Sequence, residues 1–170
     1  RDGVLESPDP YLVEVLRFAR QIAESSDGAF DITVQPLWSL HAEAKKQSRT
    51  PRAAELQAAR EKVDWRRVEA GTERVRLHGD GTALTLNAIA QGFAADVSLR
   101  VLREHGVRHA LVDTGELGAI GRNSEGEPWK IGIQHPRQEE AFAAVPLLQD
   151  RFLATTGDHQ TAFSADFTRR

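Results

Sequence analysis

The first part of the chain carries a clear helical pattern. Apolar residues from Leu12 to Ala23 recur at spacings of three and four, which places them on one face of a helix. "SPDP" precedes this run, so we expect Asp9 to cap the helix and Pro10 to lie in its first turn. "SSDG" is expected to end the helix, and the following "AFDITVQPLW" begins like a strand.

The middle of the chain alternates between polar, helical and strand-like patterns. The polar stretch His41–Arg52 predicts a loop, and "TPRAAELQAAREKV" predicts a helix capped by Thr50. "WRRVEAGTERVRLHGDGTALTL" is broken by Gly71 and by "GDG", which predicts a strand, a hairpin and another strand. A third helix is expected over Ile89–His105, with Gly106 ending it.

The last part of the chain offers five short strand candidates, "HALVDTG", "GAIG", "PWKIGIQHP", "AFAAVPLL" and "RFLATTG". Regular alternation of strands and helices is absent, so the pattern favours an α+β fold with a largely antiparallel sheet over a doubly wound sheet. A length of 170 residues suits one domain with a sizeable core.

Composition narrows the classes of function. Hydrophobic residues make up 40% and charged residues 28%, as in ordinary soluble proteins, and no apolar run is long enough to span a bilayer. The net charge of −3 gives no general basic field, so no nucleic-acid partner is expected. The absence of cysteine excludes disulfides, thiolate metal sites and a cysteine nucleophile. The six histidines lack convincing zinc-site spacing, because Gly106 should end the helix between His105 and His109.

Three stretches carry candidate chemistry, each with two interpretations. In "GAFDITVQPLW", Asp31 and Thr33 fall on one side of a strand, which is either an edge strand with Asp31 capping a turn or a polar edge at a pocket. In "LTLNAIAQGFAAD", Asn87 and Ala88 precede a helix with Gly92 in its first turn. That arrangement suits an approaching anion, or simply an N-cap at Asn87 with Gly92 giving close helix–sheet packing.

The third stretch is rich in glycine. In "LVDTGELGAIG" the glycines at 115, 118 and 121 recur every third residue. They indicate either tight turns and bulges at strand ends or a backbone that makes room for a flat ligand. "ATTGDHQTAF" places two adjacent hydroxyls before Gly157, and these either bind phosphate or ring atoms or sit on a strand end.

Taken together, "GAFDITVQPL", "AIAQGFAAD", "LVDTGELGAIG", "PWKIGIQHP" and "ATTGDHQTAF" resemble the ApbE family, the FAD:protein FMN transferases. They occur in the family's order over nearly the whole chain. "LNAIAQGF" and "DTGELGAIG" look most like the NosX branch, which serves the nitrous-oxide reduction system. The resemblance implies an ApbE-like (T-fold-like) domain over residues 1–170 with flanking helices, lacking N- and C-terminal segments that members normally have.

The resemblance also implies a function. Members bind FAD and Mg²⁺ and transfer FMN to a Thr or Ser hydroxyl of a target flavoprotein, and many are exported, so a periplasmic location is expected. It implies a cofactor-binding set, a backbone metal ligand at Ala88, and no assigned catalytic residue. The cofactor-binding set is Ala29, Phe30, Asp31, Thr33, Thr85, Asn87, Thr155, Thr156 and Gly157.

Departures from the family pattern keep a second hypothesis open. The family usually has Asp at the position of Thr85, Gly at Gln35, the second Gly of a pair at Glu116, and Lys or Glu at Gln91. A histidine-containing segment and the side-chain metal ligands normally lie beyond this sequence. The alternative is therefore a non-catalytic FAD-binding maturation or scaffold protein.

Overall fold

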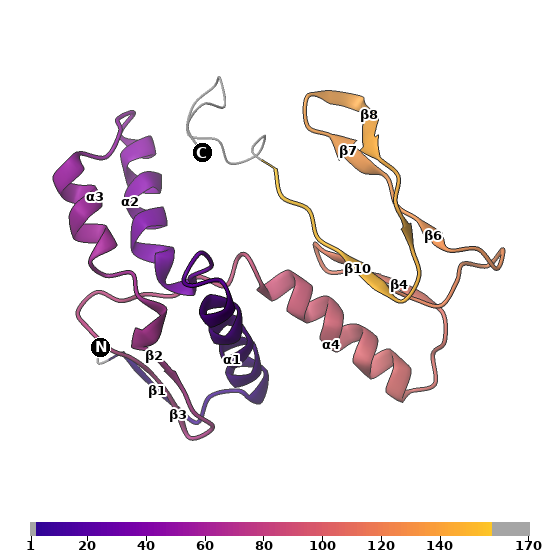
Figure 1. Cartoon of the computed structure of the whole chain (residues 1–170), viewed down its shortest axis with the longest axis horizontal. Helices are drawn as coiled ribbons and strands as arrows, with labels where there is room; N and C mark the ends of the chain where they lie inside the picture. The colour runs from indigo at the N-terminus through magenta and orange to yellow at the C-terminus, as the bar shows by residue number, and fades with distance from the viewer. Residues whose placement is uncertain (1–2, 158–170) are drawn as a thin grey trace. The chain divides into compact units, whose positions relative to one another are not determined.

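The computed structural model describes residues 3–157. Contacts divide the chain into two compact units, Arg1–Ile89 and Ala90–Arg170, called here the first and the second unit (Figure 1). Every strand pair in the described residues is antiparallel, and helices accompany the strands in both units. The expected α+β class with antiparallel sheets is confirmed.

A helix and a three-stranded sheet organise the first unit. Helix α1 covers Pro10–Ser25, and the Asp9 side chain accepts the Tyr11 N–H at 2.8 Å, which confirms the predicted cap. The sheet has the order β1-β3-β2, with β1 at Val4–Glu6, β2 at Val68–Ala70 and β3 at Arg74–Leu77. The predicted hairpin is therefore confirmed as β2 and β3. Strand β1 was missed, because three residues are too few for a visible alternation.

The strand expected after α1 is wrong. Residues Ile32–Val34 form a 3₁₀ helix, η1, and α2 follows over Gln35–Lys46, so the loop expected from residue 41 is helical as far as residue 46. The β-branched residues of "ITV" suggested a strand. Local capping by Asp31 and a proline in the first turn of α2 favour the helical path instead. The loop prediction is therefore wrong for residues 41–46, which belong to a helix, and confirmed for residues 47–52.

Helix α3 covers Ala53–Arg60 and begins later than predicted. Its N-cap position is Arg52 rather than Thr50, and the Glu55 carboxylate accepts the Arg52 backbone N–H at 2.7 Å. An acceptor at the third helical position satisfies one of the free N–H groups at the helix start. After α3, η2 at Trp65–Arg67 replaces the first residues of the predicted strand.

The hydrogen bonds of Glu55 predict a measurable pH dependence of stability. The side chain of Arg52, its backbone N–H and the Arg49 guanidinium lower the pKa of Glu55 from its ordinary value near 4.5 to about 2. Because the folded pKa is depressed, the stabilisation is present above about pH 4.5 and is lost as the pH falls through about 2. A ¹³C NMR titration of the Glu55 carboxyl should show this low midpoint, and Arg52→Ala should raise it. A midpoint near 4.3 in the unmodified chain would contradict the assignment.

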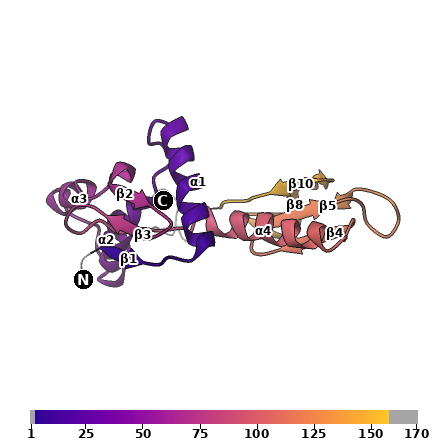
Figure 2. The same cartoon turned by 90° about the horizontal axis from the view of Figure 1, so that it is seen from below.

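The second unit packs one helix on a three-stranded sheet (Figure 2). Helix α4 spans Ala90–Glu104, within one residue of the prediction at both ends, and Gly106 follows with φ +80°. The sheet order is β10-β5-β4, with β4 at Ala110–Asp113, β5 at Leu117–Ile120 and β10 at Arg151–Leu153.

Two further strand pairs complete the described part of the second unit. Strand β6 at Trp129–Lys130 pairs with β9 at Leu147–Leu148, and β7 at Ile133–His135 pairs with β8 at Gln138–Ala144. The five predicted candidates are therefore seven strands, because "PWKIGIQHP" and "AFAAVPLL" each contribute to two. In contrast, residues 82–86 form no strand, so the last strand predicted before α4 is wrong.

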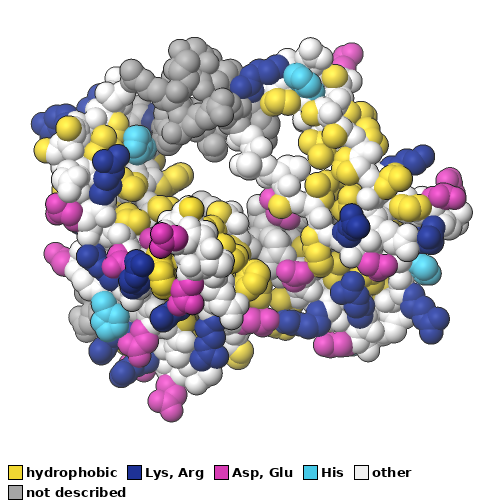
Figure 3. Space-filling model, in the orientation of Figure 1, with side chains coloured by type: hydrophobic (Ala, Val, Ile, Leu, Met, Phe, Trp, Pro, Cys, Tyr) yellow, Lys and Arg dark blue, Asp and Glu magenta, His cyan; other side chains and the backbone are white. Residues whose placement is uncertain are grey.

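The distribution of charged side chains on the surface agrees with the small net charge of the chain. Figure 3 shows basic and acidic side chains interspersed over the visible face, without a continuous basic stripe. No helix in residues 3–157 has both the length and the apolar character needed to cross a bilayer.

Candidate functional site

Asp31 is held by the first unit's own backbone. Its Oδ1 accepts the Thr33 N–H at 2.7 Å and the Thr33 hydroxyl at 2.6 Å, and its Oδ2 accepts the Trp65 N–H at 3.0 Å. Both carboxylate oxygens therefore bond to groups of the protein. The expected capping role of Asp31 is confirmed, and the bond to Trp65 ties η1 to η2 across 34 residues of sequence.

Thr33 lies inside the first unit rather than at the mouth of a pocket. Its side chain is fully buried, and its hydroxyl donates to Asp31 and accepts the Asp64 N–H at 2.8 Å. The interpretation of Thr33 as part of a polar edge at a pocket is therefore wrong. The period-two pattern misled because Ile32 and Thr33 are neighbours in a 3₁₀ turn, where both become buried.

Ala29 and Phe30 form the turn that leaves α1. Gly28 has φ +78° and donates its N–H to the Ala23 carbonyl, while Ser26 accepts the N–H groups of Ala29 and Phe30. This arrangement leaves the Ala29 side chain exposed and that of Phe30 partly exposed. Ala29 and Phe30 thus both keep side-chain surface that a ligand could reach.

Thr85 joins this turn to the segment before α4. Its N–H donates to the Ile32 carbonyl at 2.8 Å, and its hydroxyl oxygen accepts the Asn87 N–H at 3.3 Å. Asn87 and Ala88 follow in an exposed turn. The structure therefore brings together two stretches that are about 50 residues apart in sequence, as a shared binding site requires.

The first turn of α4 carries neither an acidic side chain nor a side chain at Gly92. A Cβ added at Gly92 would meet no described atom within 4 Å outside its chain neighbours and its own helix's backbone. The alternative explanation of Gly92 as a close helix–sheet contact is therefore wrong for the described residues. Asn87 is also not the N-cap, because α4 begins three residues later at Ala90. Free N–H groups and the positive end of the helix dipole make such a terminus favourable for an anion.

In the second unit, the turn between β4 and β5 binds the start of α4. The Thr114 hydroxyl lies 2.9 Å from the Gln91 carbonyl oxygen and 3.2 Å from that of Glu116, so its proton is available to either acceptor. Gly115 has φ +92°, and the Gln91 side chain covers the place where a Cβ would stand. A residue with a side chain at position 115 would strain the turn and displace Gln91.

The same turn reaches the predicted Thr155–Gly157 segment. The Glu116 Oε2 accepts the Thr155 N–H at 3.0 Å, and the side chains of Thr155 and Thr156 are exposed. Gln91 from the start of α4, the "DTGELGA" turn and the "ATTG" segment therefore meet within the second unit. We take this cluster, made of Gln91, Thr114, Glu116 and Thr155, as the second unit's candidate site.

The glycine repeat has a structural explanation. A Cβ at Gly118 would stand 2.8 Å from Leu99 Cδ1 and 2.9 Å from Phe152 Cε1, and one at Gly121 would overlap His109. Gly115 and Gly121 also have positive φ angles. The space beside these glycines is filled by the protein itself, so the interpretation of a backbone cleared for a flat ligand is wrong. That of tight turns at strand ends is confirmed for Gly115 and Gly121, whereas Gly118 lies inside β5.

Sequence reasoning missed Gln91 and Thr114 as members of this cluster. Gln91 was noted only as a departure from a family pattern, and its contribution is a backbone carbonyl that any residue possesses. For Thr114 a signal existed. Asp-Thr-Gly between two strand candidates predicts a tight turn, and the Asp113 carboxylate accepts the Gly115 N–H at 2.9 Å as such turns require.

The described residues test the expected metal site only in part. Among residues 3–157 no three His, Asp or Glu side chains lie close enough together to hold a metal ion. The Ala88 carbonyl is a suitable hard oxygen ligand for Mg²⁺, but magnesium needs several oxygen ligands in octahedral geometry. Within the described part of the chain no cluster of three His, Asp or Glu side chains is therefore available for Mg²⁺, and the Ala88 carbonyl would be one ligand among several.

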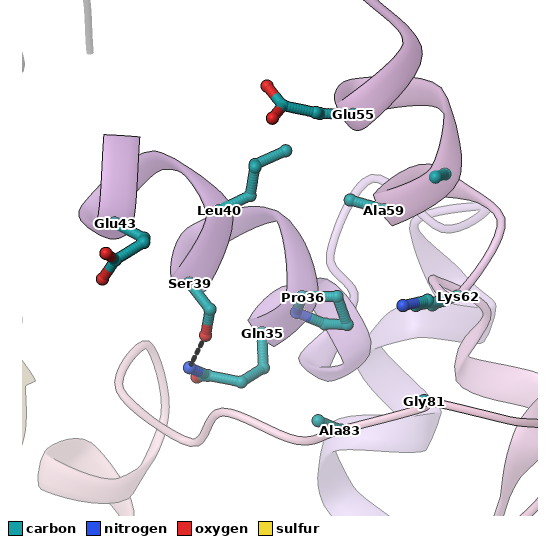
Figure 4. A pocket seen from close by; sticks show the side chains of 11 residues that line it. Gln35, Pro36, Ser39, Leu40, Glu43, Glu55, Ala59, Lys62, Gly81 and Ala83 are labelled. Carbon is teal, nitrogen blue, oxygen red and sulfur yellow. Dashed lines mark hydrogen bonds between the residues drawn. The ribbon is translucent and has the colours of Figure 1, made fainter. Parts of the chain in front are cut away.

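A groove in the first unit lies apart from the predicted residues (Figure 4). It is formed by α2, α3 and residues 81–83, with Glu55 and Lys62 among its lining side chains. Gln35, which departs from the family pattern, points toward Ser39 and donates to its hydroxyl at 2.9 Å. None of the predicted cofactor-binding residues lines this groove.

Comparison with known proteins assigns the family. A sequence model described as the ApbE family matches residues 3–170. The chain belongs to the ApbE family. ApbE relatives include the FAD:protein FMN transferase of Salmonella typhimurium, 27% identical over 166 residues, covering 93% of this chain and 47% of the relative. The FAD:protein FMN transferase of Treponema pallidum is 30% identical over 178 residues, covering 95% of this chain and 49% of the relative.

Solved ApbE structures share the fold. The ApbE protein of Thermotoga maritima superposes with a TM-score of 0.81 at 26% identity, covering 96% of this chain and 54% of the other. The apo flavinyl transferase ApbE of Pseudomonas stutzeri gives 0.76 at 29% identity, covering 99% and 55%. The chain spans about half the length of the curated relatives that it matches.

Proposed function

We propose that the protein containing this chain transfers FMN from FAD to a Thr or Ser hydroxyl of a target flavoprotein. The observation that carries this proposal is the match to the ApbE family over residues 3–170, with relatives that are named FAD:protein FMN transferases. The shared fold with a flavinyl transferase of known structure adds support. FAD is then the substrate, and the modified flavoprotein and AMP are the products.

The reaction is a phosphoryl transfer. The acceptor hydroxyl oxygen forms a bond to the phosphorus of the FMN phosphate, the bond from that phosphorus to the AMP oxygen breaks, and AMP leaves. The proton of the hydroxyl passes to a base that we assign to no residue of this chain. When bound, Mg²⁺ would neutralise charge on the pyrophosphate. The protein's own task is to hold the pyrophosphate and the acceptor in line.

Several features of the chain suit that task. In the first unit, the accessible Ala29–Phe30 turn lies just before η1, whose Ile32 carbonyl accepts the Thr85 N–H. In the second unit, the bare start of α4 offers N–H groups to an anion, and Thr155 and Thr156 present hydroxyls that can donate to phosphate or flavin atoms. We propose the Ala88 carbonyl as the chain's contribution to the Mg²⁺ ion.

The biological setting is also a proposal. The NosX-like motifs support a target in the maturation of a nitrous-oxide reduction system, and export of many family members supports a periplasmic location. One observation favours the alternative of a non-catalytic FAD-binding protein. Glu116 places a carboxylate beside the Thr155 N–H, and a negative charge there opposes an anionic cofactor.

A titration followed by flavin fluorescence tests the proposal. FAD should bind in a Mg²⁺-dependent manner to this chain or, where the natural protein extends beyond it, to the full-length protein. The form that binds should then link FMN to a peptide carrying an acceptor threonine, which mass spectrometry detects. Binding without transfer by the full-length protein would favour the non-catalytic alternative. Absence of binding in every form would overturn the proposed function.

A further inference from the structure

Glu116 makes a contact that spans two distant parts of the second unit. It stands just before β5, and its side chain is partly buried. Its Oε2 accepts the N–H of Thr155, 39 residues later, at 3.0 Å. Thr155 opens the exposed Thr155–Gly157 segment that follows β10, for which the sequence predicts contact with the cofactor.

The carboxylate takes the place of a backbone partner. The antiparallel register of β10 and β5 ends at the pair Leu153 and Leu117. Continued beyond that pair, the register would set Thr155 opposite Gly115, but Gly115 has φ +92° and turns the chain out of the strand. The N–H of Thr155 would therefore lack a partner in the ladder, and the Glu116 side chain supplies one.

We propose that Glu116 is a positioning residue for the flavin site. Its carboxylate fixes the start of the Thr155–Gly157 segment beside β5, so that the hydroxyls of Thr155 and Thr156 are presented to FAD in one arrangement. This inference rests on the proposed function, because it names FAD as the molecule that the segment contacts.

The hydrogen bond and the charge of Glu116 act in opposite directions. The bond reduces the conformational freedom that the segment would lose on binding, which strengthens affinity. The negative charge lies close to an anionic cofactor, which weakens affinity. A variant that keeps the acceptor oxygen and removes the charge separates the two effects.

Three variants provide that separation. Glu116→Gln retains an oxygen that can accept the Thr155 N–H and carries no charge. Glu116→Ala removes both the acceptor and the charge. Glu127→Ala is the matched control, because it removes the same charge from an exposed position in the same unit.

The first readout needs no FAD. Amide hydrogen exchange followed by NMR should show the Thr155 N–H exchanging about tenfold faster in Glu116→Ala than in the unmodified protein. Glu116→Gln should stay within about threefold of the unmodified rate, and Glu127→Ala should be unchanged. Equal Thr155 exchange rates in all four proteins would overturn the positioning role.

The second readout is the FAD dissociation constant of the form that binds FAD. Glu116→Ala should weaken binding about tenfold, while Glu116→Gln should bind as tightly as the unmodified protein or more tightly. Unchanged affinity in Glu116→Ala, or equal weakening in both variants, would overturn the inference and leave the proposed function standing. Absence of FAD binding in the unmodified protein would instead contradict the proposed function, and the exchange rates would still decide the contact.

Discussion

Asp31→Ala is expected to destabilise the first unit by about 3 kcal/mol, because three hydrogen bonds to one carboxylate are lost together. The Thr33 hydroxyl and the N–H groups of Thr33 and Trp65 would all lose an acceptor, in surroundings that are partly buried. Removal of the carboxylate also breaks one of the two bonds that join η1 to the start of η2, leaving the bond from the Asp64 N–H to the Thr33 hydroxyl. Urea unfolding followed by circular dichroism measures the loss, and exchange of the Trp65 N–H locates it.

Two further substitutions make this test specific. In Asp31→Asn one oxygen remains to accept from Thr33, but the amide group would face the Trp65 N–H with a second donor, so an intermediate loss of about 1–2 kcal/mol is expected. Asp27→Asn is the control. It removes the same charge four residues earlier from an exposed side chain at φ +49°, a conformation that asparagine tolerates. Similar stability of Asp31→Ala and Asp27→Asn would contradict the role of Asp31.

The role of Asp31 bears on how a functional motif is interpreted. A resemblance to a cofactor-binding motif carries over residue types and spacing, whereas the hydrogen bonds show which groups the protein itself already uses. Both oxygens of Asp31 and the hydroxyl of Thr33 have protein partners. Under the proposed function, weaker FAD binding in Asp31→Ala would therefore be expected even without direct contact, since η1, which follows the Ala29–Phe30 turn, would lose the bonds that Asp31 makes.

The helices with long apolar stripes could be predicted from the sequence. The pattern from Leu12 to Ala23 and the cap at Asp9 gave α1, and Gly106 marked the end of α4. Errors occurred where short-range hydrogen bonds outweigh propensity. "ITV" is strand-like by composition, and Asp31 makes it helical by accepting the Thr33 N–H. The second oxygen of Asp31 binds the Trp65 N–H, a tertiary contact that no local window contains.

The candidate site likewise contains one contact that the sequence predicts and one that it does not. Thr85 was predicted to belong with the Ala29–Asp31 motif, and its N–H does bind the Ile32 carbonyl next to it. Thr155 was predicted from its hydroxyl, yet the contact that places it uses its backbone N–H and the carboxylate of Glu116. Every residue except proline carries the same backbone N–H donor, so a sequence pattern cannot reveal which of these donors needs a partner.

Leu99→Ala is expected to destabilise the second unit by about 2–5 kcal/mol. Leu99 is fully buried, and its Cδ1 fills the space that the missing side chain of Gly118 leaves beside β5. Truncation would open a cavity between α4 and the sheet. Urea unfolding measures the loss, with Val101→Ala as the control, because Val101 lies on the same helix with 40% of its surface exposed. A loss no greater than that of the control would contradict the packing described here.

A double substitution tests whether Leu99 and Gly118 pack directly against each other. Gly118→Ala alone should be destabilising, because its Cβ would stand 2.8 Å from Leu99 Cδ1 and 2.9 Å from Phe152 Cε1. In Leu99→Ala the first of these conflicts disappears while the second remains. The double variant should therefore lose less stability than the sum of the two single losses, by about 0.5–1.5 kcal/mol. Strict additivity would mean that the leucine moves aside at no cost, and that the glycine is required at position 118 by Phe152 alone.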